Sequence, residues 1–343
     1  KFVKTYPTSQ YADDALYELG NTYVNQNQND KGIATYDKLI SGYKSSSYVA
    51  KAILKQGLIY YNSSKEDLAL GKFKKVVAEY PNSPESIEAV STARLIYVDK
   101  GQVDEYAAWV KTLSFVEVSD ADLDNDTYES AEKQYLQNNS KQAISGFSSY
   151  VSKFPNGLHA LKANFYLAQL YFADNLESNS VKHYEFVVSK PRNEFTEQAL
   201  ARLCQVHLKA KNYDSAIPVL KRLETEADFP QNTTYAQSNL MKSYYEKQDF
   251  TNAVVYADKV LKNDKIDDRI KSDAQIIVAR SAIKTNDEAK AKEAYAKLQK
   301  IAKGELAAEA LYYDAYFKNK EGKFDHQMLW YKKLLKIIQD TNI

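Results

Sequence analysis

A hairpin-like pattern over residues 43–84 recurs along the whole chain of 343 residues, and this recurrence limits the folds that the chain can adopt. Apolar residues at helical spacing occupy 52–61, a polar break follows at 62–65, and a second apolar stripe runs over 68–77. Pro81 ends the second stripe, because proline donates no amide hydrogen and its ring clashes with the preceding turn. Each repeat is therefore predicted to consist of a first helix, a turn and a second helix.

The first helices share a column of small residues, and Gly57 is taken as the reference position of its repeat. Alignment of the repeats puts nine reference positions at intervals of 34–38 residues, namely Gly20, Gly57, Arg94, Glu132, Ala168, Cys204, Met241, Ala279 and Tyr313. Alanine stands five residues before the reference in eight of the nine repeats, and tyrosine stands three residues after it in seven. The small residues predict that two helices cross closely. Leucine at Gly57 is therefore expected to be destabilising, and alanine nearly neutral or stabilising.

The second helices carry a small residue followed four positions later by a larger one, which puts the two side chains on one face of a helix. These pairs are Gly32/Tyr36, Ala69/Phe73, Ala143/Phe147, Ser180/Tyr184, Ala216/Leu220 and Ala291/Tyr295. A single hairpin cannot bury its apolar stripe, so the repeats are expected to stack on one another. Only 10 glycines and 7 prolines occur, and residues that favour helices fill the runs between them, which predicts an all-α chain.

The same columns resemble those of the tetratricopeptide repeat family. The family pattern of L-G-x-x-Y, a small residue, an aromatic residue and a proline stands here as Leu19-Gly20…Tyr23…Gly32…Tyr36 and as Gly57…Tyr60…Ala69…Phe73…Pro81. The resemblance implies a right-handed superhelical solenoid of about nine helix-turn-helix repeats. The chain departs from the family pattern at Arg94 and Glu132, where a small residue is expected, and in the second helix of the third repeat.

Two repeats close on Y-P-x-S segments, Tyr6-Pro7-Thr8-Ser9 and Tyr80-Pro81-Asn82-Ser83. These segments and the long period are similar to a subgroup of the family found in bacterial cell-envelope proteins. That subgroup includes outer-membrane lipoproteins of the β-barrel assembly machinery and the periplasmic coordinator of the Tol-Pal system. The resemblance implies a periplasmic or outer-membrane-associated protein, with a cytoplasmic protein as the alternative.

The repeats fall on both sides of an irregular segment. Residues 1–110 are interpreted as the N-terminal repeats, with residues 1–5 as the last turn of a truncated first hairpin, and residues 127–343 as the C-terminal repeats. Residues 111–126 carry no helical stripe and contain five acidic residues, which predicts an irregular acidic joint. The repeats on the two sides are expected to form one continuous solenoid.

Composition and motifs exclude several classes of function. The 46 Lys and Arg residues nearly balance the 45 Asp and Glu residues, so no net field favours nucleic acid or an anionic membrane surface. No apolar run is long enough to span a bilayer, and we expect no direct insertion into a membrane. The four histidines show no metal-ligand spacing, and Cys204 occupies a small-residue column, which favours a core position.

Four aspartates alternate over residues 120–126 and resemble the start of a calcium loop. The match fails at Asn125, where the loop needs glycine, and at Ala131, where it needs a bidentate glutamate. A solvated linker with a capping aspartate is the preferred interpretation. No nucleophile elbow, phosphate loop or dinucleotide-binding motif occurs, so we expect neither an enzyme nor a bound cofactor or metal.

The family resemblance also implies where a partner would bind. In the family the first helices line the concave face, and side chains six and three before, and one and four after, the reference position point inward. This register selects Tyr17, Asn21, Leu54, Leu58, Tyr61, Phe165, Gln169, Phe172, Tyr235, Lys242 and Tyr245. An apolar and aromatic groove suits a peptide or helix of a protein partner, although each ring could instead pack between hairpins.

The sequence thus predicts a non-catalytic scaffold for protein–protein interaction. Tyr61, Phe172 and Tyr245 are the expected anchors, because interface energy concentrates in a few buried aromatic side chains. The alternative is a structural spacer within a larger repeat protein, with no ligand in the groove.

Overall fold

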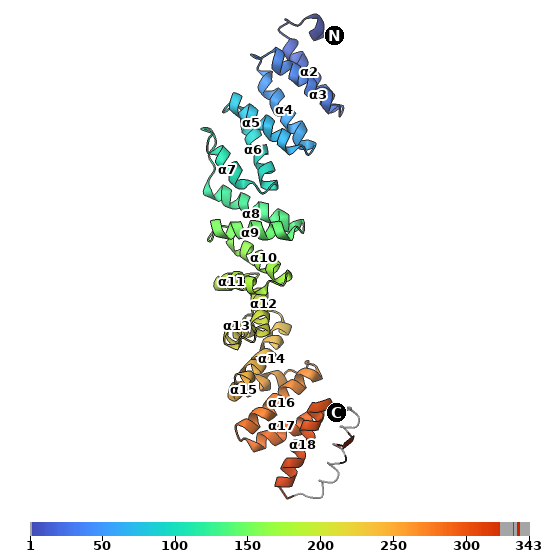
Figure 1. Cartoon of the computed structure of the whole chain (residues 1–343), viewed down its shortest axis with the longest axis vertical. Helices are drawn as coiled ribbons and strands as arrows, with labels where there is room; N and C mark the ends of the chain where they lie inside the picture. The colour runs from blue at the N-terminus through green and yellow to red at the C-terminus, as the bar shows by residue number, and fades with distance from the viewer. Residues whose placement is uncertain (1, 323–331, 333–334, 337–343) are drawn as a thin grey trace. The chain divides into compact units, whose positions relative to one another are not determined.

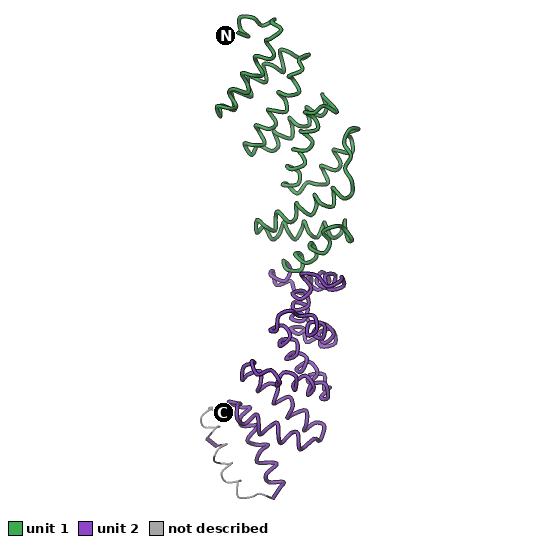
Figure 2. The backbone as a smooth tube through the Cα atoms, turned by 180° about the vertical axis from the view of Figure 1, so that it is seen from behind, with its two compact units in different colours: residues 1–170 green, residues 171–343 purple. Residues whose placement is uncertain are grey.

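The computed structural model describes residues 2–322, 332, 335 and 336, and all regular structure within them is helical (Figure 1). These residues form eighteen helices and no β-strand, which confirms the predicted all-α class. The chain divides into two compact units, residues 1–170 (unit 1) and residues 171–343 (unit 2) (Figure 2). The division falls within one helix, and it does not fall at the predicted acidic joint.

The even-numbered helices from α2 are the first helices of the repeats, and the odd-numbered helices from α3 are the second helices. Unit 1 contains α1 (Phe2–Thr5), α2 (Ala12–Asn25), α3 (Asn29–Gly42), α4 (Tyr48–Asn62), α5 (Glu66–Glu79), α6 (Pro84–Asp99), α7 (Val103–Val110), α8 (Asp120–Leu136) and α9 (Ser140–Lys153). The division lies in α10 (Ala160–Ala173). Unit 2 continues with α11 (Glu177–Ser189), α12 (Thr196–Lys209), α13 (Tyr213–Glu226), α14 (Pro230–Glu246), α15 (Phe250–Leu261), α16 (Asp268–Lys284), α17 (Glu288–Leu298) and α18 (Gly304–Lys320). Most of the second helix predicted for the ninth repeat lies outside the described residues.

Helices that follow one another in sequence pack side by side within each unit. In unit 1 consecutive helices pack together from α2 through α9, and the contacts of the short helix α7 are the least extensive. In unit 2 consecutive helices pack together from α11 through α18. First helices of neighbouring repeats also contact one another. For example, α2 contacts α4, and α14 contacts α16. Each hairpin therefore buries its apolar stripe against the next hairpin, as the repeat pattern predicts.

The predicted small/large pairs of the second helices form the centre of this packing. The larger members are at most 1% exposed, namely Tyr36, Phe73, Phe147, Tyr184, Leu220 and Tyr295. The Phe73 ring lies directly on Gly57, because a Cβ added at Gly57 would come within 2.5 Å of the ring Cε1 atom. This part of the sequence prediction is confirmed.

One residue in every turn from a first to a second helix has a left-handed backbone. These residues are Asn27, Ser64, Gly101, Asn138, Asn175, Lys211, Gln248 and Asn286, with φ between 54° and 71°. The next residue donates its N–H to a carbonyl near the end of the first helix, as Lys65 does to Tyr60 at 2.9 Å. This hydrogen bond closes a Schellman motif, for which glycine and asparagine are the preferred residues. The left-handed residue therefore fixes the register of each repeat.

That register moves the reference position of the fourth repeat. The left-handed residue lies seven positions after the reference in the first three repeats, so Asn138 places the fourth reference at Ala131. Ala131 is 2% exposed, whereas Glu132 is half-buried and accepts a hydrogen bond from Tyr128. The assignment to Glu132 was wrong because it placed Tyr135 in the column of tyrosines that stand three residues after the reference position. The fourth repeat thus keeps the small residue that it had seemed to lack.

The ninth repeat is shifted in the same way. Gly322 has φ 76° and places the reference at Ala315, whereas the sequence alignment placed it at Tyr313. Ala310 then falls in the alanine column and is fully buried, and Tyr316 is 48% exposed. Several tyrosines lie close together in α18, so Tyr316 was wrongly placed in the tyrosine column.

The third repeat is irregular because its second helix ends early. α7 has 8 residues, whereas the second helices before and after it, α5 and α9, have 14 each. Residues 111–119 follow without helical structure, and their apolar side chains pack on the core cluster of α4 to α7. The loop thus fills part of the space that a full-length helix would occupy.

Only part of the predicted joint 111–126 is irregular, because α8 begins at Asp120. Ser119 caps this helix by accepting the Asp122 N–H at 3.1 Å, and the Asp122 carboxylate accepts the Ser119 N–H at 2.9 Å. This capping box satisfies two backbone donors and favours an early helix start. The predicted aspartate cap was wrong, because the N-cap is Ser119 and Asp122 completes the capping box from the third position of the helix.

His183 is a buried titratable group in α11, and we expect it to make unit 2 sensitive to acid. Its side chain is 6% exposed, and burial lowers its pKa from 6.5 to about 4. Since the folded pKa is depressed, the stability that the neutral ring contributes is present above pH 6.5 and is lost as the pH falls towards 4. We expect a loss of about 2–3 kcal/mol in the free energy of unfolding over this range.

Urea denaturation of wild type and of His183→Gln at several pH values tests this expectation. The variant should lose less stability than wild type on acidification. Parallel pH profiles of the two proteins would mean that His183 is not the responsible group.

Candidate partner-binding surface

The first-helix face is defined here as the side chains six and three before, and one and four after, each reference position. Two of the predicted groove residues on this face are not accessible, because Leu54 and Phe165 are each only 5% exposed. Both side chains are taken up by core packing. Leu58, Tyr61 and Gln169 are half-buried, and Leu58 and Tyr61 pack against the core cluster of α4 to α7.

In the first repeat the predicted residues are engaged with their neighbours. Tyr17 stacks on Tyr48 of the next repeat with ring centroids 5.0 Å apart. Asn21 accepts a hydrogen bond from the hydroxyl of the buried Tyr36 at 2.7 Å. Burial raises the pKa of Tyr17 and that of Tyr36. These side chains join hairpins and also form the walls of the face.

In unit 2 the same face carries more charge than predicted. Lys242 forms an ion pair with Asp273 at 2.6 Å, and Arg280 of the next repeat pairs with Glu309 at 2.6 Å. Tyr245 contacts Phe250 edge-on with ring centroids 5.7 Å apart. Tyr235 packs against the unit 2 core, and burial raises its pKa to about 12. This part of the face is therefore a polar surface with aromatic positions.

A pocket of about 690 Å³ opens on the first-helix face of unit 2, at a repeat from which the sequence analysis chose no residue. Its lining includes Gln198, Ala201 and Gln205 of α12, which lie six and three before and one after the reference Cys204. The register alone could have identified these positions. They were not selected because they are neither aromatic nor large and apolar.

Arg202 lies in the same pocket and is held in place by two contacts. Its guanidinium stacks over the Phe172 ring at 4.5 Å from the centroid, and its Nη1 donates to Gln205 Oε1 at 2.9 Å. Cation–π stacking of this kind orients the guanidinium plane. Phe172 thus supports Arg202 in this structure, whereas the sequence analysis expected it to contact the partner directly.

The far wall of the pocket is the turn before α14. The Glu197 carboxylate accepts the N–H groups of Asp228 and Phe229 at 3.1 Å each, and the Asn232 side-chain amide at 2.7 Å. Three hydrogen bonds to one carboxylate fix the turn firmly. They hold Phe229 at the rim, where it is 63% exposed.

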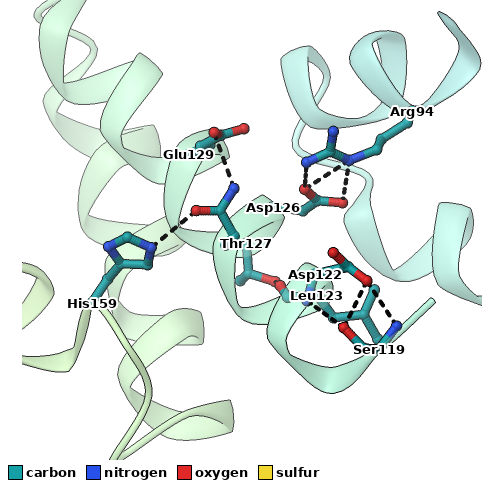
Figure 3. A network of polar contacts seen from close by, with 9 residues as sticks. Arg94, Ser119, Asp122, Leu123, Asp126, Thr127, Glu129 and His159 are labelled. Atoms are coloured by element: carbon teal, nitrogen blue, oxygen red, sulfur yellow. Dashed lines mark hydrogen bonds and ion pairs between the residues drawn. The ribbon is translucent and has the colours of Figure 1, made fainter. Parts of the chain in front are cut away.

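A second polar cluster lies in unit 1, between α6 and α8 (Figure 3). Arg94 Nε donates to both carboxylate oxygens of Asp126 at 2.9 Å, and its Nη2 also contacts this carboxylate. The Asp126 side chain is fully buried, and the Arg94 side chain is 35% exposed. Arg94 occupies the reference position of the third repeat, and Asp126 occupies the alanine column of the fourth. Two departures from the repeat pattern therefore face and neutralise one another.

The other aspartates of this region are also used in packing. The Asp124 carboxylate accepts hydrogen bonds from the hydroxyl of Tyr150 and from the Leu158 N–H, the latter at 2.8 Å. Within the described residues, no group of three or more His, Cys, Asp or Glu side chains is arranged to hold a metal ion. None of the described helices combines the length and the apolar character needed to cross a bilayer.

Comparison with known proteins identifies the repeats. A family model described as "Tetratricopeptide repeat-like domain" matches residues 106–237, and one described as "Tetratricopeptide repeat" matches residues 14–46 and 51–83. No curated protein sequence matches the chain.

Several solved structures of tetratricopeptide repeats are similar at low identity. The P58(IPK) tetratricopeptide repeat domain is 11% identical over 94% of this chain and 92% of that one, with a TM-score of 0.30. A tetratricopeptide repeat protein of Parabacteroides merdae is 10% identical over 88% and 98%, with a TM-score of 0.29. The C-terminal part of a repeat protein of Cytophaga hutchinsonii is 15% identical over 75% and 98%, with a TM-score of 0.34.

The two family models describe the same kind of repeat and together match more than half of the residues. They coincide with stacked helix pairs in both units. Residues 14–46, 51–83 and 106–237 therefore form tetratricopeptide repeats.

Proposed function

We propose that this chain is a non-catalytic scaffold that binds a segment of a protein partner on its first-helix face, with the α12 pocket of unit 2 as the main contact. Tetratricopeptide repeats generally mediate protein–protein interaction, and their fold is in general a non-enzymatic interaction scaffold. The observation that carries the proposal is the pocket of about 690 Å³ at the register positions of α12.

The chemistry of this pocket suits a peptide segment. Arg202 offers an oriented cation, and Gln198 and Gln205 offer amide groups that can both donate and accept hydrogen bonds. Phe229 adds an exposed ring at the rim, which can cover an apolar side chain of the partner. An extended segment with exposed backbone amides and one apolar side chain satisfies all of these groups.

The predicted anchors contribute less directly in this proposal. Tyr61 and Tyr245 pack partly against the cores of their units, and Phe172 lies under Arg202. Truncation of any of the three is expected to lower stability as well as binding. Arg202 and Phe229 are therefore the sharper test residues.

The bacterial cell envelope is the proposed location. The support is the pair of Y-P-x-S closures at Tyr6-Pro7 and Tyr80-Pro81, which are similar to those of envelope members of the family. Fractionation of the source cells, with detection of the chain by antibody, tests this location. Recovery of the chain in the cytoplasmic fraction would contradict the proposed location.

Site-specific photo-crosslinking tests the binding face. A photoreactive phenylalanine at Gln205, inside the α12 pocket, should crosslink a partner in cells that produce the chain. The matched control carries the same group at Lys221, an exposed position on the second helix α13 outside this pocket. If a partner crosslinks at Lys221 and not at Gln205, the binding site lies outside the first-helix face. No partner at either position would favour the spacer alternative.

A further inference from the structure

A separate pocket of about 560 Å³ in unit 2 is lined by an unusual concentration of lysines. It lies among the C-terminal ends of α15 and α17 and the start of α16. Its lining residues are Asp258, Leu261, Lys262, Lys271, Gln275, Lys297, Lys300 and Ile301. It shares no residue with the α12 pocket, so binding at this pocket would be independent of the proposed function.

The positive charge of this pocket is largely uncompensated. Lys297 pairs with Glu293 at 2.6 Å, and the only acidic lining residue, Asp258, lies 3.6 Å from Lys290. No ion pair with any residue that the structure describes is formed by the remaining lysines, Lys262, Lys271 and Lys300. Like charges gathered in a concave site raise the local potential and attract anions.

Helix dipoles explain only part of this cluster. Lys262 and Lys297 lie at the ends of α15 and α17, where a cation stabilises the negative end of a helix. Lys271 is the fourth residue of α16, and a cation near a helix start is unfavourable. Lys271 is also half-buried, which adds a desolvation cost. An anionic partner would offset both costs.

Gln275 provides a second, independent indication of a ligand. It lines the pocket one turn after Lys271 and is 91% buried, since its exposed fraction is 9%. Its side-chain amide makes no hydrogen bond within the described part of the chain. The amide atoms reach the solvent of the pocket and have no protein partner among the described residues, so they are free to bind a ligand. A ligand carboxylate beside Lys271 could accept the amide N–H of Gln275.

We propose that this pocket binds an acidic segment of a protein partner, with a Glu or Asp side chain between Lys271 and Gln275. The flanking lysines 262 and 300 then meet neighbouring acidic residues, and Leu261 and Ile301 cover the apolar parts of the segment. A small anion would leave these two apolar side chains uncovered. A flat membrane surface would not reach the buried amide of Gln275.

Binding of a fluorescein-labelled hexaglutamate peptide, followed by fluorescence anisotropy, tests the proposal on the full chain. The double variant Lys271→Gln/Lys300→Gln should bind about tenfold more weakly than wild type, since two charge contacts are lost. The charge-matched control is Lys141→Gln/Lys182→Gln, which removes two exposed lysines outside the pocket and should bind as wild type does. Equal affinity of the two double variants would overturn the proposal.

A third variant separates a ligand role of Gln275 from a structural one. Gln275→Leu should weaken peptide binding and leave the urea midpoint close to that of wild type, because the amide makes no hydrogen bond within the described part of the chain. A lower midpoint with unchanged binding would make Gln275 a structural residue and contradict the assignment.

Competition experiments test the identity of the anion. Inorganic phosphate, at constant ionic strength, should displace the peptide only weakly, and phosphatidylglycerol vesicles should bind wild type and the Lys271→Gln/Lys300→Gln variant equally. Full displacement by phosphate would reassign the pocket to a small anion. Loss of vesicle binding in the variant would reassign it to a lipid surface.

Discussion

Replacement of Arg94 by leucine is expected to lower the free energy of unfolding by about 3 kcal/mol. The Asp126 side chain is fully buried, and both of its oxygens accept hydrogen bonds from Arg94. Removal of the guanidinium leaves a buried carboxylate with no countercharge. Such a charge costs several kcal/mol even where the pair itself contributes little.

Urea denaturation measures this loss of stability, and two matched variants serve as controls. Lys100→Met removes the cation of the exposed ion pair with Asp67 and should cost at most about 1 kcal/mol. Arg94→Ala/Asp126→Ala restores small residues at both columns and should recover most of the loss. A midpoint for Arg94→Leu equal to that of Lys100→Met would contradict the importance of the buried pair.

The second large effect is expected at Gly57, where alanine should lower the free energy of unfolding by about 1–3 kcal/mol. The added Cβ would lie 2.5 Å and 2.8 Å from two ring carbons of Phe73, a residue with no solvent exposure. A real Cβ does not approach a ring this closely, so the ring or the helix must shift. The sequence-based expectation that alanine is nearly neutral here is therefore replaced, and leucine should cost more than alanine.

Gly71→Ala is the matched control for this substitution. Gly71 lies in the middle of α5, and a Cβ there meets no atom within 4 Å. Its replacement should stabilise the helix by up to about 1 kcal/mol, because glycine is a poor helix former. Gly57→Ala/Phe73→Leu should recover part of the loss by reducing the ring volume. A Gly57→Ala protein as stable as Gly71→Ala would show that Phe73 can move freely.

The repeated core was predictable from the sequence because each of its contacts is local. A small residue and a larger one four positions later lie on one face of a second helix, and this holds in six repeats, which include those of Tyr36 and Tyr295. The same reasoning predicted the alternation of first and second helices that the described residues show. Periodicity is a strong signal where the same contact must form in every repeat.

The register of two repeats was missed because side-chain type was weighed above backbone conformation. Asn138 and Gly322 stand at the left-handed positions that fix Ala131 and Ala315 as references. Both residues are of the types that favour this conformation, and they recur with the repeat period. A search for that column of Asn and Gly would have corrected the alignment.

The irregular third repeat could not be predicted in the same way. Arg94 and Asp126 are 32 residues apart, and either alone looks like a defect in a small-residue column. Their compensation depends on the contact between α6 and α8, which no local pattern encodes. The early end of α7 likewise depends on how residues 111–119 pack on the core.

For the candidate site, the sequence did not predict which residues of the first-helix face are accessible. The register also covers positions on α12, but large apolar residues were preferred and no α12 residue was selected. Two of the selected residues, Leu54 and Phe165, belong to the core. Whether a ring lies in a groove or between hairpins depends on the distance to the neighbouring repeat. Exposed amides and a supported arginine carry no periodic apolar signal.

The dissociation constant of the crosslinked partner, measured with thermal unfolding on the same variants, tests the central claim most directly. Arg202→Ala and Phe229→Ala should each weaken binding by about tenfold or more with little change in the unfolding temperature, because both side chains lie at the pocket surface. Leu68→Ala, which removes an exposed side chain from the second helix α5, should change neither quantity. Unchanged binding by both pocket variants in folded protein would contradict a partner site on the first-helix face.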